Sequence, residues 1–251
     1  MRRAIKTHAS SVFIGKEACM SSVLVTGSNR GIGLEWVRQY AEDGWRVFAT
    51  CRHPEEAREL RKIAERTRSV SVHRMDVTRP DEINAVAVEL LEEPIDVLVS
   101  NAGVYLEKYW DVGLRRLNYE DWVYSFQVNS LGPVRVTEAF MEHTAKSEKR
   151  LAVITTTHMA SITDIASPGA YYYRSTKAAL NAVMEGIAHE LKEKGIGLLL
   201  LHPGHVKTRM GGGGTDLQAT ESVKGMRALV ERFTQSDSGR FFRYDGKEMP
   251  W

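Results

Sequence analysis

The stretch that decides the fold is Val23-Leu24-Val25-Thr26-Gly27-Ser28-Asn29-Arg30-Gly31-Ile32-Gly33. Its apolar start predicts a buried β-strand, and the residues from Gly31 to about Asp43 predict a helix. The glycines permit a tight turn, and the helix behind them points its free N–H groups and the positive end of its dipole at any anion bound there. Because any strand-to-helix turn can contain glycine, this pattern alone is a weak indication of a nucleotide site.

Short apolar runs and helical patterns alternate along the rest of the chain. Further strands are expected at 45–49, 70–76, 95–99, 151–154, 196–201 and, shorter, near 241–242. Helices are expected from Pro54 onward, over 80–91, within 118–144 and over 173–194. This order, with strands that are apolar on both faces, predicts an α/β fold in which helices cover both sides of a parallel sheet. We therefore predict a single domain with a doubly wound sheet of about seven strands.

The composition excludes several classes of protein. The chain has 251 residues and a net charge of +2, which argues against a nucleic-acid or polybasic membrane partner. No apolar run approaches the roughly 18 residues of a membrane span. Cys19 and Cys51 are the only cysteines and show neither metal spacing nor a disulfide framework. We therefore expect a cytoplasmic protein that binds neither nucleic acid nor membrane.

Residues 1–20 differ from the rest of the chain. No acidic residue precedes Glu17, whereas the basic residues are Arg2, Arg3, Lys6 and Lys16. An organelle-targeting peptide can have this composition. The segment lacks an amphipathic period, however, and Met20 stands directly before the first strand. We expect residues 1–20 to be a non-essential extension and residues 21–251 to form the folded domain.

The residues after the second strand indicate which dinucleotide is bound. Proteins that use NAD generally have an acidic residue there for the ribose 2′-hydroxyl. This chain has Thr50-Cys51-Arg52 and no acid before Glu55. Arg30 is expected on the same side, and two guanidinium groups suit a 2′-phosphate. Arg52 could instead be a solvated residue near the start of a helix. We expect NADP(H) to be preferred over NAD(H).

Tyr173 and Lys177 form a candidate catalytic pair. Residues four apart lie about one helical turn apart and share a face. An ammonium beside a phenol favours the phenolate and lowers its pKa from roughly 10 toward neutrality, which would make the tyrosine a proton donor at physiological pH. The same spacing also occurs where a packed tyrosine and a surface lysine happen to share a helix.

Six motifs occur in order along the chain: Thr26–Gly33 as T-G-x-x-x-G-x-G, Asp76-Val77, Asn101-Ala102-Gly103, Asn129, Tyr173-x-x-x-Lys177, and Pro203-Gly204-His205-Val206-Lys207-Thr208. With these motifs, residues 21–251 resemble the short-chain dehydrogenase/reductase family. Within that family, residues 157–162, 171–177 and 244–251 are most similar to the C-signalling factors and sniffer-type carbonyl reductases. The resemblance implies a Rossmann fold with a bound dinucleotide.

The resemblance also implies which residues contact the cofactor. Asp76 and Val77 would contact adenine, the residues 101–103 would close over the cofactor, and the residues 203–208 would bind the nicotinamide carboxamide. The full set is Gly27, Ser28, Asn29, Arg30, Gly31, Ile32, Gly33, Arg52, Asp76, Val77, Asn101, Ala102, Gly103, Tyr173, Lys177, Pro203, Gly204, Val206 and Thr208. No metal is expected, because His202 and His205 lack a third ligand.

The expected catalytic residues are Asn129, Thr157, Tyr173 and Lys177. The family has a serine that donates a hydrogen bond to the substrate carbonyl, and here Thr157 aligns with it and keeps the hydroxyl. Ser161, closer to the usual spacing from Tyr173, is the alternative. The resemblance implies that Lys177 lowers the tyrosine pKa and binds the nicotinamide ribose, while Asn129 holds a water for proton resupply.

The predicted activity is the NADPH-dependent reduction of a small-molecule carbonyl, an aldehyde, ketone or quinone, with Tyr173 as proton donor. The reverse oxidation of an alcohol uses the same residues. A second hypothesis is an NADP(H)-binding regulator with vestigial catalysis. We expect Val104, Tyr105 and His158 on the substrate side, and a lid near 205–222 hinged at 211–214. A homodimer or homotetramer is also possible within this family.

Overall fold

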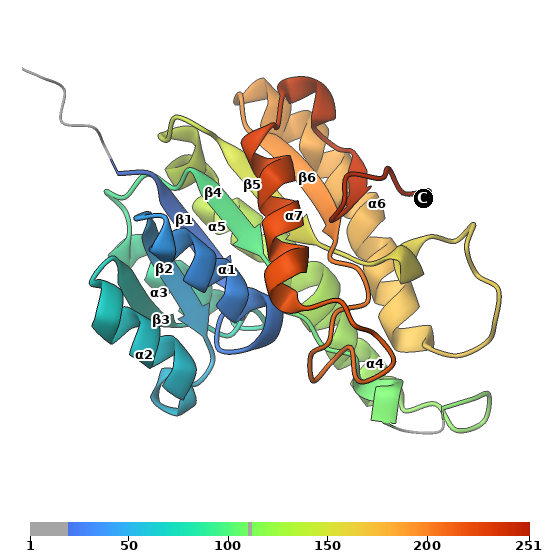
Figure 1. The fold of residues 1–251 in the computed structure, drawn as a ribbon. Coiled ribbons are helices and arrows are strands. Elements are labelled where there is room, and N and C mark those ends of the chain that lie inside the picture. The colour runs from blue at the N-terminus through green and yellow to red at the C-terminus, as the bar shows by residue number, and fades with distance from the viewer. Residues whose placement is uncertain (1–19, 110–111) are drawn as a thin grey trace, which may run out of the picture.

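A computed structural model describes residues 20–109 and 112–251 and contains a seven-stranded sheet in the order β3-β2-β1-β4-β5-β6-β7 (Figure 1). Every pair of neighbouring strands is parallel. The strands are β1 (Ser22–Thr26), β2 (Arg46–Cys51), β3 (Val70–Arg74), β4 (Val97–Ser100), β5 (Leu151–Thr155), β6 (Gly197–His202) and β7 (Phe241–Arg243). The predicted parallel Rossmann sheet is therefore confirmed.

Helices cover both faces of this sheet (Figure 1). One face carries α1 (Gly31–Glu42), α2 (Arg58–Thr67) and α7 (Ala219–Glu231). The other carries α3 (Pro80–Glu89), α5 (Gly132–Ala145) and α6 (Tyr171–Glu193). Along β1, Val23 and Val25 pack into the first layer and Leu24 packs into the second, because successive side chains of a strand point to opposite faces. This explains why the strand is apolar throughout.

The strand order reverses between β1 and β4. From β1 the chain moves outward to β2 and β3, and it then returns to the other side of β1 through β4. In such sheets the loops at the carboxyl ends of the two central strands diverge and leave a crevice for a ligand. The loops after Thr26 and after Ser100 border this crevice.

The expected long helix within 118–144 is interrupted. It consists of α4 (Tyr119–Phe126), a π-helical turn (Gln127–Leu131) and α5. Pro133 has no N–H to donate to the carbonyl of Asn129, as a continuous α-helix requires. Gly132 packs so closely on Val77 that a Cβ there would lie 2.9 Å from the valine side chain. The widened turn therefore places Asn129 in irregular helical backbone, which frequently occurs at functional sites.

Two other helices differ from expectation. Pro54–Glu56 forms a separate 3₁₀ turn, and α2 begins only at Arg58. The helix α7 was not predicted, although its buried residues are spaced for a helix: Val223, Met226, Leu229 and Val230. The predicted lid over 205–222 therefore overlaps the first turn of α7 in residues 219–222, and movement of the remainder stays a prediction. Among the described residues, no helix combines the length and apolar character needed to cross a membrane.

Candidate active site

The loop after β1 is shaped to approach a ligand closely. Gly27 has φ +66°, and a Cβ at this position would lie 2.9 Å from the backbone of Ala102. A Cβ at Gly33 would lie 2.3 Å from the carbonyl oxygen of Gly27. The N-terminus of α1 has no side-chain cap from Arg30. Free N–H groups at the start of a helix bind anions, so the loop fits the pyrophosphate of a dinucleotide.

The loop after β4 is fastened to the end of β1. The backbone N–H groups of Asn101 and Ala102 both donate to the hydroxyl of Thr26, at 2.9 and 3.0 Å. A Cβ on Gly103 would lie 3.3 Å from Oδ1 of Asn129 and 3.9 Å from Nζ of Lys177. The structure thus brings four of the predicted motifs together at the carboxyl end of the sheet.

Asn129 is fully buried and connects two elements. Its Oδ1 accepts a hydrogen bond from the N–H of Val104 at 2.8 Å, and its Nδ2 donates to the carbonyl of Val104 at 2.9 Å. The same Nδ2 donates to the hydroxyl of Thr176 at 3.1 Å. The amide therefore fixes the loop after β4 against α6, beside the candidate catalytic pair.

Tyr173 lies between an aromatic ring and a hydroxyl group. Its ring stacks on that of Tyr105 with centroids 4.5 Å apart, so Tyr105 lies beside the candidate catalytic tyrosine. The Thr157 hydroxyl, which accepts a hydrogen bond from the N–H of Met159 at 3.2 Å, lies close enough to lower the pKa of the phenol. Burial raises the pKa of Tyr173 above its usual range, Tyr105 adds to this effect, the Thr157 hydroxyl opposes it, and Glu107 again raises the pKa. Tyr173 therefore keeps its proton over the physiological pH range.

Ser161, the alternative to Thr157, contacts another part of the chain. Its hydroxyl donates to the main-chain oxygen of Trp251 at 2.9 Å and accepts from the N–H of Asp164 at 3.3 Å. The residue is fully buried. Of the two hydroxyls left open by the sequence, that of Thr157 is the one that acts on the pKa of Tyr173, and its role in catalysis stays a prediction.

Lys177 is buried in the same cluster. Its Nζ donates to the carbonyl oxygen of Thr155 at 2.8 Å, and burial lowers its pKa to about 7. The expectation that this ammonium lowers the tyrosine pKa is not borne out by the structure. Lys177 is not among the groups that act on the pKa of Tyr173, and burial disfavours the charged form of each side chain.

The segment from His202 to Thr208 lies beside the glycine loop. A Cβ on Gly31 would lie 3.6 Å from the methyl group of Thr208. Nδ1 of His202 accepts from the N–H of Gly204 at 3.3 Å, and burial, with charges from His158 and Arg243 nearby, lowers the His202 pKa to about 3. The neutral imidazole thus acts as a hydrogen-bond acceptor that holds the Pro203-Gly204 turn.

The predicted contacts at the adenosine end are more exposed. Arg30 and Arg52 both lie on the surface, and Nη1 of Arg52 donates to the hydroxyl of Tyr124 at 3.0 Å. Oδ1 of Asp76 accepts from the N–H and the hydroxyl of Thr78 at 2.9 and 2.8 Å. Tyr124 thus holds the Arg52 guanidinium at the surface, where it can meet an anion.

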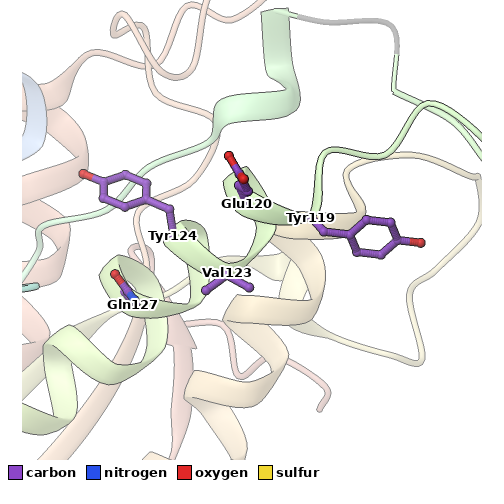
Figure 2. A pocket seen from close by; sticks show the side chains of 5 residues that line it. All are labelled: Tyr119, Glu120, Val123, Tyr124 and Gln127. Carbon is purple, nitrogen blue, oxygen red and sulfur yellow. The ribbon is translucent and has the colours of Figure 1, made fainter.

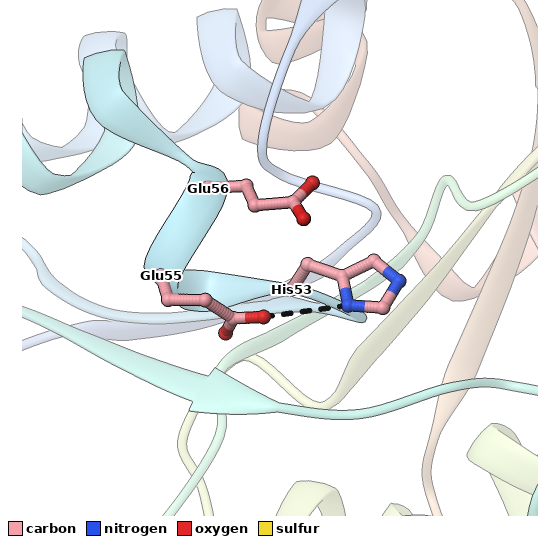
Figure 3. A group of neighbouring side chains, drawn as sticks. All are labelled: His53, Glu55 and Glu56. Carbon is pink, nitrogen blue, oxygen red and sulfur yellow. Dashed lines mark ion pairs between the residues drawn. The ribbon is translucent and has the colours of Figure 1, made fainter.

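Three of the side chains that follow Arg52 carry atoms that could bind a metal ion. Within the described ranges, one group of at least three potential ligands lies close together, and Figure 3 shows its members, His53, Glu55 and Glu56. His53 and Glu55 form an ion pair at 3.4 Å, and all three residues are exposed. Exposed groups of this kind are common without a metal, so the cluster is treated as a surface feature.

Two hollows differ in their relation to the site. One of about 430 Å³ is lined by His158, Asp164, His202, Gly204, His205, Thr215, Leu217, Arg243, Tyr244 and Met249. It joins the predicted substrate-side histidine to the predicted lid. The other, about 410 Å³, lies on α4 and is lined by the residues that Figure 2 labels: Tyr119, Glu120, Val123, Tyr124 and Gln127. None of these five is a predicted site residue.

One residue of the site was not found from the sequence. Glu107, from a short 3₁₀ helix at Leu106–Tyr109, accepts a hydrogen bond from the backbone N–H of Tyr173 at 2.7 Å. The two residues lie 66 positions apart in the chain. Glu107 belongs to a loop without a recognisable motif, so no sequence pattern pointed to this contact.

Comparison with known proteins agrees with this geometry. The family model of the short chain dehydrogenases matches residues 21–217, and the chain therefore belongs to this family. The C-signal protein of Myxococcus xanthus is 38% identical over 169 residues, which make up 67% of this chain and 100% of that protein. The fold and the family together define an oxidoreductase.

Solved structures give the same result. The NADPH-bound carbonyl reductase from chicken fatty liver has a TM-score of 0.86 and 31% identity, covering 92% of this chain and 99% of that one. The carbonyl reductase Sniffer of Drosophila melanogaster has a TM-score of 0.84 and 27% identity, covering 92% of this chain and 100% of that one. The chain is therefore similar to two carbonyl reductases, one of which was solved with NADPH bound.

The burial of Lys177 predicts a pH dependence of stability. In the unfolded chain its pKa is 10.5, against about 7 in the fold, so between these values the unfolded state binds more protons. The contribution of Lys177 to the free energy of unfolding therefore rises from pH 7 to pH 10.5. Lys177→Met, measured by urea unfolding without added cofactor, should gain stability relative to wild type near pH 7 and lose that gain toward pH 10.5.

Lys192→Met, an exposed position on the same helix, serves as the control and should follow the wild-type curve at every pH. Parallel curves for wild type and Lys177→Met would show that Lys177 is not buried in its neutral form.

Proposed function

We propose that the protein is an NADPH-dependent carbonyl reductase that converts an aldehyde, ketone or quinone into an alcohol. The observation that carries this proposal is the cluster of Tyr173, Thr157 and Lys177 at the carboxyl end of β5. The glycine loop and the residues 203–208 lie next to each other and provide a place for the cofactor. The similarity to an NADPH-bound carbonyl reductase supports the same activity.

Bound NADPH supplies the hydride that adds to the carbonyl carbon. Tyr173 donates its phenolic proton to the carbonyl oxygen as negative charge develops there. The Thr157 hydroxyl donates a hydrogen bond to the same oxygen and polarises the carbonyl. Lys177 binds the ribose hydroxyls of the nicotinamide nucleotide. Burial raises the pKa of Tyr173, so the phenol carries the proton that it donates.

Asn129 contributes to returning a proton from solvent to the site after Tyr173 has donated its own. Its side chain is engaged by Val104 and Thr176, whereas Pro133 has no N–H for its backbone carbonyl. We infer that this carbonyl holds a water molecule that links Lys177 to bulk solvent. The hollow beside His158 would receive the body of the substrate, with His158 shaping the pocket.

A second candidate is an NADP(H)-binding regulator with vestigial catalysis. The 38% sequence identity with the C-signal protein favours this second candidate. The retention of Tyr173, Lys177 and Asn129 argues against it, since a pure sensor has little use for all three. NADPH oxidation over a panel of aldehydes, ketones and quinones separates the two, because tight NADPH binding without turnover on any of them would favour the regulator.

A second copy of the chain is the proposed partner. Exposed apolar side chains on α4, the π-helical turn and α6 would be covered in such a dimer: Tyr119, Val123, Leu131 and Val183. The hollow in Figure 2 lies within the α4 part of this surface. The proposed location in the cytoplasm rests on the composition of the sequence.

Tyr173→Phe is expected to reduce kcat by about 10²–10⁴-fold, because it removes the proton donor while leaving the ring in place. NADPH affinity, measured by fluorescence titration, should remain close to wild type. Tyr171→Phe removes a hydroxyl from the same helical turn and should retain full activity. Unchanged turnover in Tyr173→Phe would overturn the assignment of the proton donor.

Thr157→Val keeps the side-chain shape but lacks the hydroxyl, and should lower kcat by roughly 10-fold to 10³-fold. Ser161→Ala should retain most of its kcat, because its hydroxyl contacts Trp251 and Asp164 instead of Tyr173. Both are measured in steady-state reduction of one carbonyl. Activity that survives the first change and is lost in the second would assign the role to Ser161.

The cofactor preference is tested at Arg52. We expect kcat/KM for NADPH to exceed that for NADH by about tenfold or more, because a guanidinium binds a phosphate strongly. Arg52→Gln should remove most of this difference by weakening NADPH alone. Arg58→Gln, an exposed change at the start of α2, is the matched control. A preference of the wild type for NADH would contradict the proposed cofactor.

A further inference from the structure

The helix that carries the catalytic pair has no cap from its own N-cap residue. Ala170 occupies that position with φ 54° and offers no side-chain acceptor. A helix leaves its first N–H groups without internal partners. Oε1 of Glu107 accepts from the N–H of Tyr173 at 2.7 Å. A distant loop therefore provides the cap at the position of the proposed proton donor.

The Glu107 side chain is costly to keep in this place. The residue is 5% exposed, and its Oε2 is buried without a hydrogen-bond partner among the described residues. Within residues 20–109 and 112–251, no lysine, arginine or histidine forms an ion pair with Glu107. Burial raises the pKa of Glu107. Three backbone N–H groups lower it in part, those of Tyr173, Glu107 and Tyr172. A serine or asparagine at the start of α6 would cap the helix without burying a carboxylate.

The surroundings of Glu107 connect it to the reacting tyrosine. It lies in the loop after β4 that also presents Tyr105, whose ring covers Tyr173. Its charge adds to the rise in the pKa of both tyrosines. The other charged or polar groups that act on this cluster are Asp121 from α4, Arg174 from α6 and Thr157 from the end of β5. Lys177 lies one turn further along α6 and donates to the carbonyl of Thr155.

We propose that Glu107 is a positioning residue for the reduction: its carboxylate fixes the backbone of Tyr173 to the loop that also carries Tyr105. The same carboxylate opposes ionisation of the phenol. This inference rests on the proposed function, because it assigns Tyr173 as the proton donor. It explains why an otherwise unfavourable buried carboxylate stands beside that residue.

Two substitutions separate the two effects of Glu107. Glu107→Gln can still accept from the N–H of Tyr173 but has no charge, so kcat below the basic limb should remain within about threefold of wild type. The basic limb of the kcat profile for reduction should move to lower pH by roughly half a pH unit to one pH unit, because the phenolate is no longer opposed by a nearby carboxylate. Glu107→Ala also removes the acceptor and should lower kcat at least about tenfold.

The control is Glu190→Gln, which removes one negative charge from the exposed part of α6 and should leave the profile unchanged. Affinity for NADPH, measured by fluorescence titration, should be the same in all variants. A merely structural cap predicts a lower melting temperature for Glu107→Ala and an unshifted profile for Glu107→Gln. An unshifted profile together with wild-type kcat in Glu107→Ala would overturn the proposal.

Hydrogen exchange distinguishes failure of this proposal from failure of the proposed function. If the wild type reduces none of the carbonyls tested, the proposed function fails. The backbone amides at 171–176 still report on positioning, and they should exchange faster in Glu107→Ala than in wild type or Glu107→Gln. Equal exchange in the three proteins would refute the positioning role whether or not turnover is observed.

Discussion

The buried side-chain amide of Asn129 is the interaction on which the geometry of the site depends. It binds both backbone groups of Val104 and the hydroxyl of Thr176, so one residue sets the distance between the loop after β4 and α6. The sheet alone could not do this, because loops at the carboxyl ends of parallel strands diverge at the point where the strand order reverses. The loop after β4 therefore owes its position against α6, the helix of the candidate catalytic pair, to a polar contact within the core.

The fold could be predicted from local patterns because its strands are buried on both faces. A run such as Val23-Leu24-Val25 has no polar face, and only a sheet covered on two sides accommodates it. The helix within 118–144 was predicted as continuous because apolar residues recur at helical spacing on both sides of the π-helical turn. Pro133 leaves one backbone carbonyl without a donor, and the sequence alone does not show how the helix adjusts to this. The helix α7 has a clear apolar spacing, but Gly225 in its middle weakens the helical pattern.

The site could be predicted where its residues stand in motifs. The structure brings Tyr173, Lys177, Asn129 and Thr157 together, and their catalytic roles remain to be tested. The ionisation of the pair could not be predicted, because spacing gives the distance between Tyr173 and Lys177 but not the extent to which each is removed from water. Glu107 escaped detection for a related reason. Its contact with Tyr173 depends on the path of a loop, and loops carry little local signal.

The π-helical turn also limits how this part of the chain can change in length. Each residue of an α-helix advances the chain by about 100° around the axis, so the wider turn rotates α4 relative to α5. Removal of a single residue there would rotate α4 by about 100° relative to α5. The exposed Tyr119 and Val123 would then be out of phase with the buried Val136 and Phe140. We therefore expect related sequences to lack insertions and deletions within 119–145. Substitutions of exposed residues in the same interval should be tolerated.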